Sequence, residues 1–204
     1  MKKRARLLAA ATIALGATAF LARAEAKKDS AKDSTKAPSP AAAARAFQND
    51  FLWNVDDVAK KILSLEEAVP QDKFKWRPAP GVRSIGEAYL HIAFGNYLLT
   101  RIATGQEPPA DAGWEMNGPK WDSKTTDKKE IKAILEKSFD HVRTVVKGLD
   151  DADLDKKVNF FGRELTSRAV LMSLLGHLNE HMGQEVAYAR SNNVVPPWSA
   201  GKGG

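Results

Sequence analysis

The sequence predicts an all-α protein built as a four-helix bundle, preceded by an export signal and a linker. Four long stretches repeat apolar residues at intervals of three and four, which is the periodicity of a helix with one buried face. Segments that contain proline and glycine separate these stretches and mark connections. With 204 residues, the chain is long enough for one domain with its own core and for additional tails.

The first 26 residues have the pattern of a secretory signal peptide. Four basic residues lie within 2–6, an apolar run covers 7–21, and small residues allow cleavage after Ala24 or Ala26. This run is shorter than the roughly 20 residues that span a bilayer. We therefore expect a cleaved Sec-type signal and a periplasmic or extracellular protein with no membrane span in the mature chain. An uncleaved N-terminal anchor is the alternative.

Composition divides the rest of the chain into a linker and a near-neutral domain. Residues 27–44 contain no large apolar side chain, so we expect a disordered linker there, a bundle over 45–198 and a flexible tail over 199–204. The formal net charge of +6 comes from the first 45 residues, because the remainder carries 21 basic and 22 acidic residues. We therefore expect no nucleic-acid partner.

The first two predicted helices have clear ends. The first covers about 43–68 and is followed by a proline. Before the second, Ser84 and Glu87 have the spacing of a capping box, in which each side chain bonds to the backbone amide of the other residue. The second helix carries His91 and ends near residue 103. His91 is either a packed histidine bonded to a neighbour or part of a site.

A long connection over 105–126 follows, with three prolines, three glycines and two tryptophans. A loop of this length in a compact domain is usually a lid or a binding loop. The alternative is that its tryptophans simply attach it to the bundle. A third helix is expected over 127–149, and we expect its histidine, His141, to be exposed because no other histidine stands at a ligand spacing.

The last third of the chain is expected to contain a tight turn or a hairpin and then the fourth helix. The stretch from 150 is acidic and irregular, and 158–165 can turn back on itself around Gly162. Thr166 has the position of an N-terminal cap for a helix over about 167–191.

Two histidines, His177 and His181, lie four residues apart in this fourth helix. Four residues turn an α-helix by about 400°, so both imidazoles face the same side, one turn apart. This spacing suits two ligands of one metal ion, although two surface or interface histidines give the same pattern. Gln184 lies one further turn along, and Gly183 leaves room beside His181 for another helix or a ligand.

Two more polar residues are candidates for a catalytic or supporting role. Glu87 is a candidate general base or hydrogen-bond acceptor near His91, with helix capping as the alternative. Gln184 is a candidate hydrogen-bond partner above the metal, with a structural hydrogen bond as the alternative. We expect Glu180 and Glu185, in the same helix as Gln184, to face solvent.

The chain resembles the DinB-like superfamily of four-helix bundles over most of 46–198. The residues that carry the likeness are Trp76-Arg77-Pro78-Ala79-Pro80-Gly81-Val82-Arg83-Ser84-Ile85-Gly86-Glu87 before His91, then His177-x-x-x-His181-x-x-Gln184, Tyr188, Arg190 and Pro196-Pro197. The resemblance implies that His91, His177 and His181 bind one divalent transition metal ion, zinc or nickel before others. Some relatives use mycothiol or bacillithiol in S-transfer or isomerisation, and the predicted export separates this chain from those cytoplasmic thiols.

The sequence supports three functional hypotheses. In the first, a metal-dependent hydrolase or transferase acts on a small molecule at the open position of a three-histidine site. In the second, the chain is a non-catalytic metal- or ligand-binding bundle of the cell envelope. In the third, the chain binds no metal and the histidines are only packing residues.

The absence of cysteine excludes disulfides, thiolate ligands and cysteine nucleophiles. The substrate and the oligomeric state stay open, a homodimer being one option.

Overall fold

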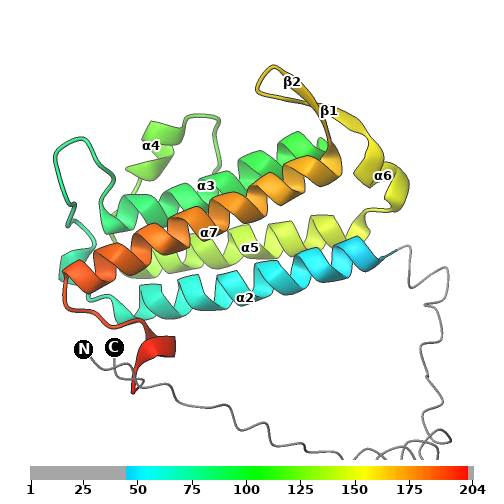
Figure 1. The fold of residues 1–204 in the computed structure, drawn as a ribbon. Helices are drawn as coiled ribbons and strands as arrows, with labels where there is room; N and C mark the ends of the chain where they lie inside the picture. The colour runs from blue at the N-terminus through cyan, green and yellow to red at the C-terminus, as the bar shows by residue number, and fades with distance from the viewer. Residues whose placement is uncertain (1–44, 202–204) are drawn as a thin grey trace, which may run out of the picture. The chain divides into compact units, whose positions relative to one another are not determined.

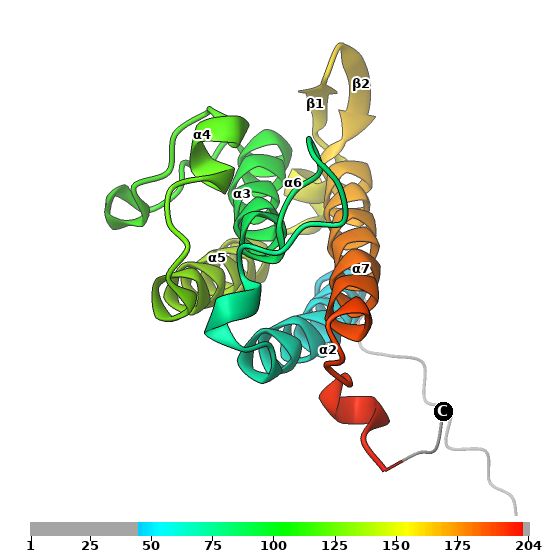
Figure 2. The same cartoon turned by 90° about the vertical axis from the view of Figure 1, so that its left-hand side faces the viewer.

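A computed structural model describes residues 45–201, in which four long helices form a bundle (Figure 1). These helices are α2 (Ala46–Ala68), α3 (Ile85–Thr104), α5 (Lys128–Gly148) and α7 (Ser167–Ser191). Each contacts two neighbours, in the cyclic order α2, α5, α3, α7, and Figure 2 shows them nearly end-on. The predicted helical bundle is confirmed. The predicted signal peptide and linker, over 1–44, lie outside the described residues.

Because α3 and α5 run in the same direction, the segment that connects them has to return along the whole length of the bundle. The start of α5 lies at the end of α2, where Lys128 Nζ donates hydrogen bonds to the carbonyls of Glu67 and Val69. The end of α5 lies at the start of α2, where Gln48 donates to the Leu149 carbonyl over 3.1 Å. Figure 1 shows that α3 and α5 point the same way. The returning segment contains two short helices, η2 (Ala110–Ala112) and α4 (Gly118–Asp122).

The predicted helix caps are present. Ser84 and Glu87 form the capping box, because the Glu87 amide donates to the Ser84 hydroxyl and the Ser84 amide donates to the Glu87 carboxylate. The Thr166 hydroxyl accepts from the Ala169 amide at the start of α7. At the other end of α3, Gly105 has a φ of 74°, the left-handed conformation that commonly ends a helix. These local bonds fix where α3 and α7 begin.

The predicted hairpin is also present, between α6 (Asp151–Asp155) and α7. Its strands are β1 (Lys157–Phe160) and β2 (Arg163–Thr166), paired antiparallel so that the first residue of β1 faces the last residue of β2. Phe161 and Gly162 make the turn with φ angles of 52° and 86°. Sequence analysis missed α6, whose capping box joins Asp150 and Asp153, because five residues are too few to show helical periodicity.

Two predictions of exposure are wrong. His141 is only 8% exposed and packs against Tyr97, with 5.4 Å between the ring centroids. Glu185 is completely buried. Both lie on the inward faces of their helices, so helical phase determines their burial and residue polarity does not. Among the helices of residues 45–201, none is both long and apolar enough to cross a membrane.

The interior also contains a second buried carboxyl group, that of Glu66 in α2. Burial raises the pKa of Glu66 to about 7, although the neighbouring cations of Lys128 and Lys132 lower it. Its two oxygens have no hydrogen-bond partner within the described part of the chain. Burial likewise raises the pKa of Glu185 well above its usual value, although the Tyr89 hydroxyl beside it lowers it. Burial therefore favours the neutral form of both the Glu66 and the Glu185 carboxyl groups.

Replacing Glu66 with Gln is expected to stabilise the fold at alkaline pH and to have no comparable effect in acid. Between pH 4.5 and about 7, the unfolded chain loses a proton that the folded chain keeps. The contribution of wild-type Glu66 to stability therefore falls as the pH rises through this range. The amide does not titrate, so we expect a gain of roughly 2–3 kcal/mol at pH 8. Urea unfolding of both proteins at pH 4 and pH 8 measures this difference in the free energy of unfolding. An equal gain in stability at the two pH values would contradict the raised pKa of Glu66.

Candidate metal centre

The three histidines predicted as metal ligands lie together between α3 and α7. Ring nitrogens of His91, His177 and His181 all lie within 4.8 Å of one another. The ring centroids are 5.2 Å apart for His91 and His177, 4.8 Å for His91 and His181, and 4.5 Å for the pair on α7. Three imidazoles at these distances can coordinate one ion and leave a further position for another ligand.

The helices α3 and α7 come close together where the ring of His177 lies against Gly95. A Cβ atom at residue 95 would lie 2.2 Å from Cε1 and 2.6 Å from Nδ1 of His177, so the ring occupies the space that any other residue would fill. Gly95 follows His91 by four residues and shares its face of α3. That spacing was visible in the sequence, but it was missed. No other helix approaches Gly183, since a Cβ there would have no neighbour within 4 Å.

His91 is held by a carboxylate that sequence analysis also missed. Its Nδ1 lies 3.3 Å from the carboxylate of Asp122 in α4, and the same carboxylate accepts a 2.7 Å hydrogen bond from Nε of Arg83. A carboxylate only accepts, so Nδ1 of His91 carries the proton and Nε2 is left as a metal ligand. The preceding residue, Trp121, fixes Asp122 because its indole donates to the Leu90 carbonyl over 2.8 Å.

His181 is oriented in the same way by Gln184. Its Nδ1 donates to Oε1 of Gln184 over 2.8 Å, and Nε2 of Gln184 donates to the Tyr188 hydroxyl over 2.8 Å. Tyr188 in turn packs edge-on against Trp76, with 5.5 Å between the ring centroids. Gln184 is therefore placed as a positioning residue, and its contacts leave Nε2 of His181 facing the cluster.

The environment keeps the α7 histidines neutral. Burial, together with the neighbouring His181 and His91, lowers the pKa of His177 to about 3. Burial also lowers the pKa of His181. Neutral imidazole is the form that binds a metal ion. In addition, Nδ1 of His177 is buried without a hydrogen-bond partner in the described part of the chain. The donor set therefore fits a divalent transition metal ion.

Glu87 lies at the edge of the site, but both of its oxygens are engaged. One accepts from the Ser84 amide over 2.7 Å and the other from Arg77 over 2.8 Å. Burial alone would raise the pKa of Glu87, but the Ser84 amide and the Arg77 cation outweigh it and lower the pKa. A carboxylate with a lowered pKa and no free oxygen is a poor proton acceptor. These contacts favour the capping role over that of a general base.

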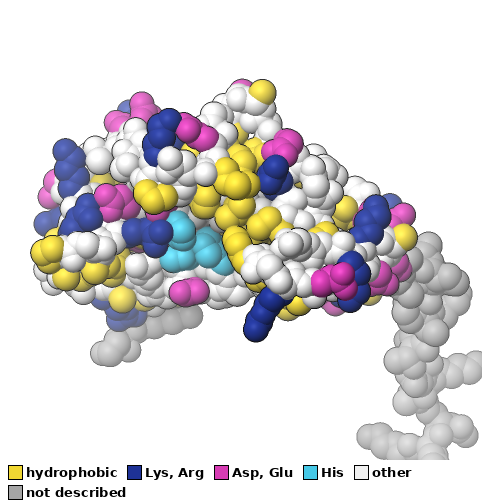
Figure 3. Space-filling view, turned by 90° about the horizontal axis from the view of Figure 1, so that it is seen from above, with side chains coloured by type: hydrophobic (Ala, Val, Ile, Leu, Met, Phe, Trp, Pro, Cys, Tyr) yellow, Lys and Arg dark blue, Asp and Glu magenta, His cyan; other side chains and the backbone are white. Residues whose placement is uncertain are grey.

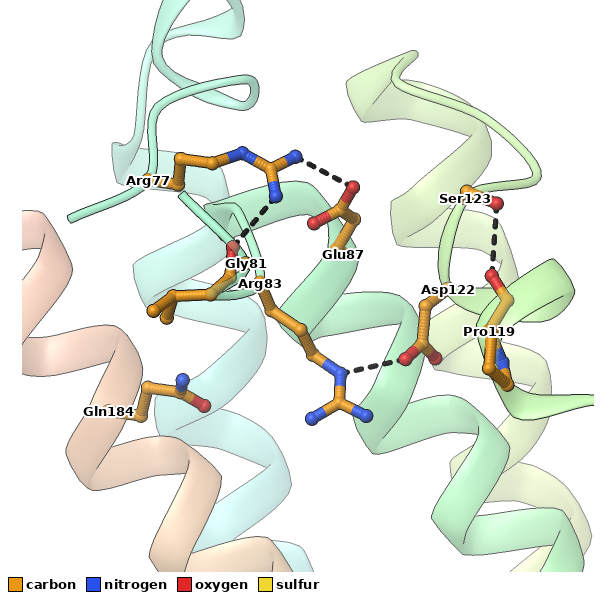
Figure 4. Close-up of a pocket in the computed structure, with 9 residues that line it drawn as sticks. Arg77, Gly81, Arg83, Glu87, Pro119, Asp122, Ser123 and Gln184 are labelled. Carbon is orange, nitrogen blue, oxygen red and sulfur yellow. Dashed lines mark hydrogen bonds and ion pairs between the residues drawn. The ribbon is translucent and has the colours of Figure 1, made fainter. Parts of the chain in front are cut away.

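A cleft of about 530 Å³ adjoins the histidine cluster. It is lined by polar side chains from three segments, among them Arg77, Arg83, Glu87, Asp122 and Gln184 (Figure 4). None of the three histidines lines this cleft itself, but two residues that do, Asp122 and Gln184, bond to His91 and His181, so the cleft adjoins the residues that hold these rings. Figure 3 shows the histidines from outside, in a hollow with basic side chains next to them. A small molecule can therefore approach the rings from solvent.

The long connection between α3 and α5 is attached to the bundle, which is one of the two roles considered from the sequence. Trp121 is 2% exposed and attaches the connection to α3. Trp114 stacks on Phe94 at 5.7 Å, and Phe94 stacks on His91 at 6.2 Å. The segment is thus fixed to the bundle and at the same time forms one wall of the site.

The fold and this cluster define a class of helical bundles in which one histidine of the second long helix meets two of the last. The family model of the DinB superfamily matches residues 54–184, and the chain belongs to this superfamily. A crystal structure of a DinB-like protein from Bacillus cereus is similar, with 21% identity, a TM-score of 0.63 and coverage of 73% of this chain and 95% of that one. A DinB-like protein from Bacillus subtilis has 20% identity, a TM-score of 0.56 and coverage of 71% and 92%. No curated protein matches the sequence.

Substitution of Gly95 by Ala is expected to displace His177 and weaken metal binding. The added methyl group would overlap the imidazole, and the ring can escape by rotating out of the cluster, so the bundle itself should persist. We expect zinc affinity, measured by competition with a chelator, to fall at least about tenfold, as for other residues that position ligands. Gly183→Ala is the matched control, because it adds the same methyl group to open space on α7. Unchanged affinity in Gly95→Ala would show that the contact does not position the ring.

Proposed function

We propose that this chain binds a divalent transition metal ion, zinc or nickel, through His91, His177 and His181. We also propose that it acts as a metal-dependent hydrolase or transferase on a small molecule. The observation that carries the proposal is the convergence of three imidazoles beside a cleft that is open to solvent. A structural metal site is usually closed by a fourth protein ligand, whereas a catalytic site keeps one position open. Within the described residues, no further His, Cys, Asp or Glu belongs to this cluster of ligand atoms.

The chain's own residues support this chemistry by holding the ligands. Asp122 and Gln184 each accept a hydrogen bond from Nδ1 of one ring, which fixes the tautomer and the ring plane. Trp114 and Phe94 form an aromatic wall on one side of His91 and limit the access of water there. A divalent ion held by these rings would supply Lewis acidity to an oxygen or sulfur atom of the reactants.

The first test is the metal content of untagged protein, measured by elemental analysis. We expect close to one equivalent of a transition metal in wild type and almost none in the double variant His177→Ala with His181→Ala. His141→Gln is the control, since His141 belongs to a different part of the interior. Absence of metal in wild type, even after titration with zinc and nickel, would exclude both the metal site and the enzyme.

The second test separates an enzyme from a non-catalytic metal-binding bundle. Metal-loaded protein is assayed against panels of ester, amide and thiol-transfer substrates, with the double variant as the blank. Turnover that depends on the metal supports the enzyme. A fully loaded protein without turnover on any panel favours the non-catalytic bundle of the cell envelope.

We further propose that the chain is exported, on the basis of the basic residues, apolar run and small residues of 1–26. Expression of the full chain in a bacterial host should give a periplasmic product whose N-terminus is Glu25 or Lys27, as determined by mass spectrometry. A product that keeps residues 1–26 in the membrane fraction would instead indicate the uncleaved anchor.

A further inference from the structure

We propose that Arg83 binds a carboxylate group of the small molecule that enters the cleft beside the histidines. This inference rests on the proposed function and adds the chemical class of the substrate. It starts from an arginine that is only partly used by the protein. Nε of Arg83 donates to Asp122 over 2.7 Å, whereas its two terminal nitrogens have no hydrogen-bond partner within the described chain. Figure 4 shows these nitrogens pointing into the space between Asp122 and Gln184.

The guanidinium group is held in a defined orientation. Asp122 is 8% exposed at its side chain and is bonded to His91 as well, so it provides a rigid anchor for Nε. Arg83 also directly precedes Ser84, whose capping box fixes the backbone at the start of α3. An arginine fixed through Nε presents its terminal nitrogens as two parallel donors, which match the two oxygens of a carboxylate.

The other charged groups of the cleft are already neutralised by their neighbours. Glu87 receives hydrogen bonds from Ser84 and Arg77, and Arg77 also donates to the Val82 carbonyl. Asp122 is engaged by Arg83 and His91. Among the described residues that line the cleft, the pair of terminal guanidinium nitrogens left without a partner is therefore that of Arg83.

A carboxylate fits this arrangement better than a more highly charged group. A phosphate dianion is usually bound by several donors or cations, whereas here a single two-donor edge is open. A divalent ion on the three neutral imidazoles would add positive charge next to the cleft, which favours an anion further. The inferred substrate is therefore a small monocarboxylate, with its carboxylate on Arg83 and its reacting part toward the histidines.

The experiment is an acetate titration followed by two-dimensional ¹H–¹⁵N NMR, with potassium chloride at equal ionic strength as the reference. The reporters are the backbone amides of Asp122 and Gln184, which exist in every variant. We expect saturable shifts with acetate in the wild type and none with chloride. Arg83→Ala should weaken acetate binding at least tenfold. Arg83→Lys keeps a cation for Asp122 but lacks the two-donor edge, so it should also weaken binding clearly.

Arg101→Ala is the charge-matched control, because this substitution also removes one positive charge from the chain. Arg101 lies near the far end of α3, where it pairs with Glu107. It should bind acetate as the wild type does. The inference is overturned if Arg83→Ala binds acetate with wild-type affinity, or if both Arg83 variants lose their metal, which would make Arg83 a structural residue. Phosphate binding at least tenfold tighter than acetate would overturn the choice of a carboxylate.

The same titration on metal-free protein separates this inference from the proposed function. If the wild type takes up no metal but still binds acetate through Arg83, the metal-dependent enzyme is excluded and the carboxylate site stands. If the wild type holds one equivalent of metal but acetate binding is absent or independent of Arg83, the metal centre stands and the carboxylate site is excluded.

Discussion

The parallel course of α3 and α5 is the constraint on which the site depends. Two consecutive helices that point the same way need a connection as long as the bundle, and this connection passes over α3. It is attached there by the Trp121 indole, and so places Asp122 against His91. The four helices alone would supply three histidines. The returning segment supplies the carboxylate that orients one of them and a wall of the cleft, so it belongs to the site as much as the helices do.

The buried polar groups near the histidines lower the stability of the fold, and the burial of apolar side chains in the bundle offsets this loss. Glu185 lies one turn beyond His181, and Tyr89 lies two residues before His91; both are fully buried. Uncharged acids and hydroxyls in such places stabilise less than apolar side chains of the same size. Further along the same two helices, Leu99 and Leu174 lie in the core, together with the buried polar side chains of Asn96 and Thr100. Apolar burial along the whole bundle therefore offsets the cost of these polar groups.

The elements were predictable from the sequence because their signals are local, whereas the environment of the site depends on contacts between distant segments. Periodicity and capping patterns are complete within about twenty residues, and they gave the four helices and the positions of the three histidines. Asp122 acts through His91 of another element, and nothing local distinguishes it. The spacing of Gly95 from His91 is local, but its contact with His177 of α7 is not. Glu185 was misjudged for another reason: it shares a face with the buried Leu178 and His181, and its charge was weighed above its place in the helical repeat.

The separation of the three histidines along the chain has a consequence for the order of events during biosynthesis. His91 belongs to the second long helix, while His177 and His181 belong to the last one, so the cluster does not exist until the C-terminal helix has been made and has packed against α3. An ion therefore cannot be captured by a partly synthesised or unfolded chain with the geometry of the finished site. Loading has to follow folding. If the chain crosses the membrane unfolded, an ion bound at the proposed site would come from those available outside the cytoplasm, and the supply of metal in that compartment would decide which ion occupies it.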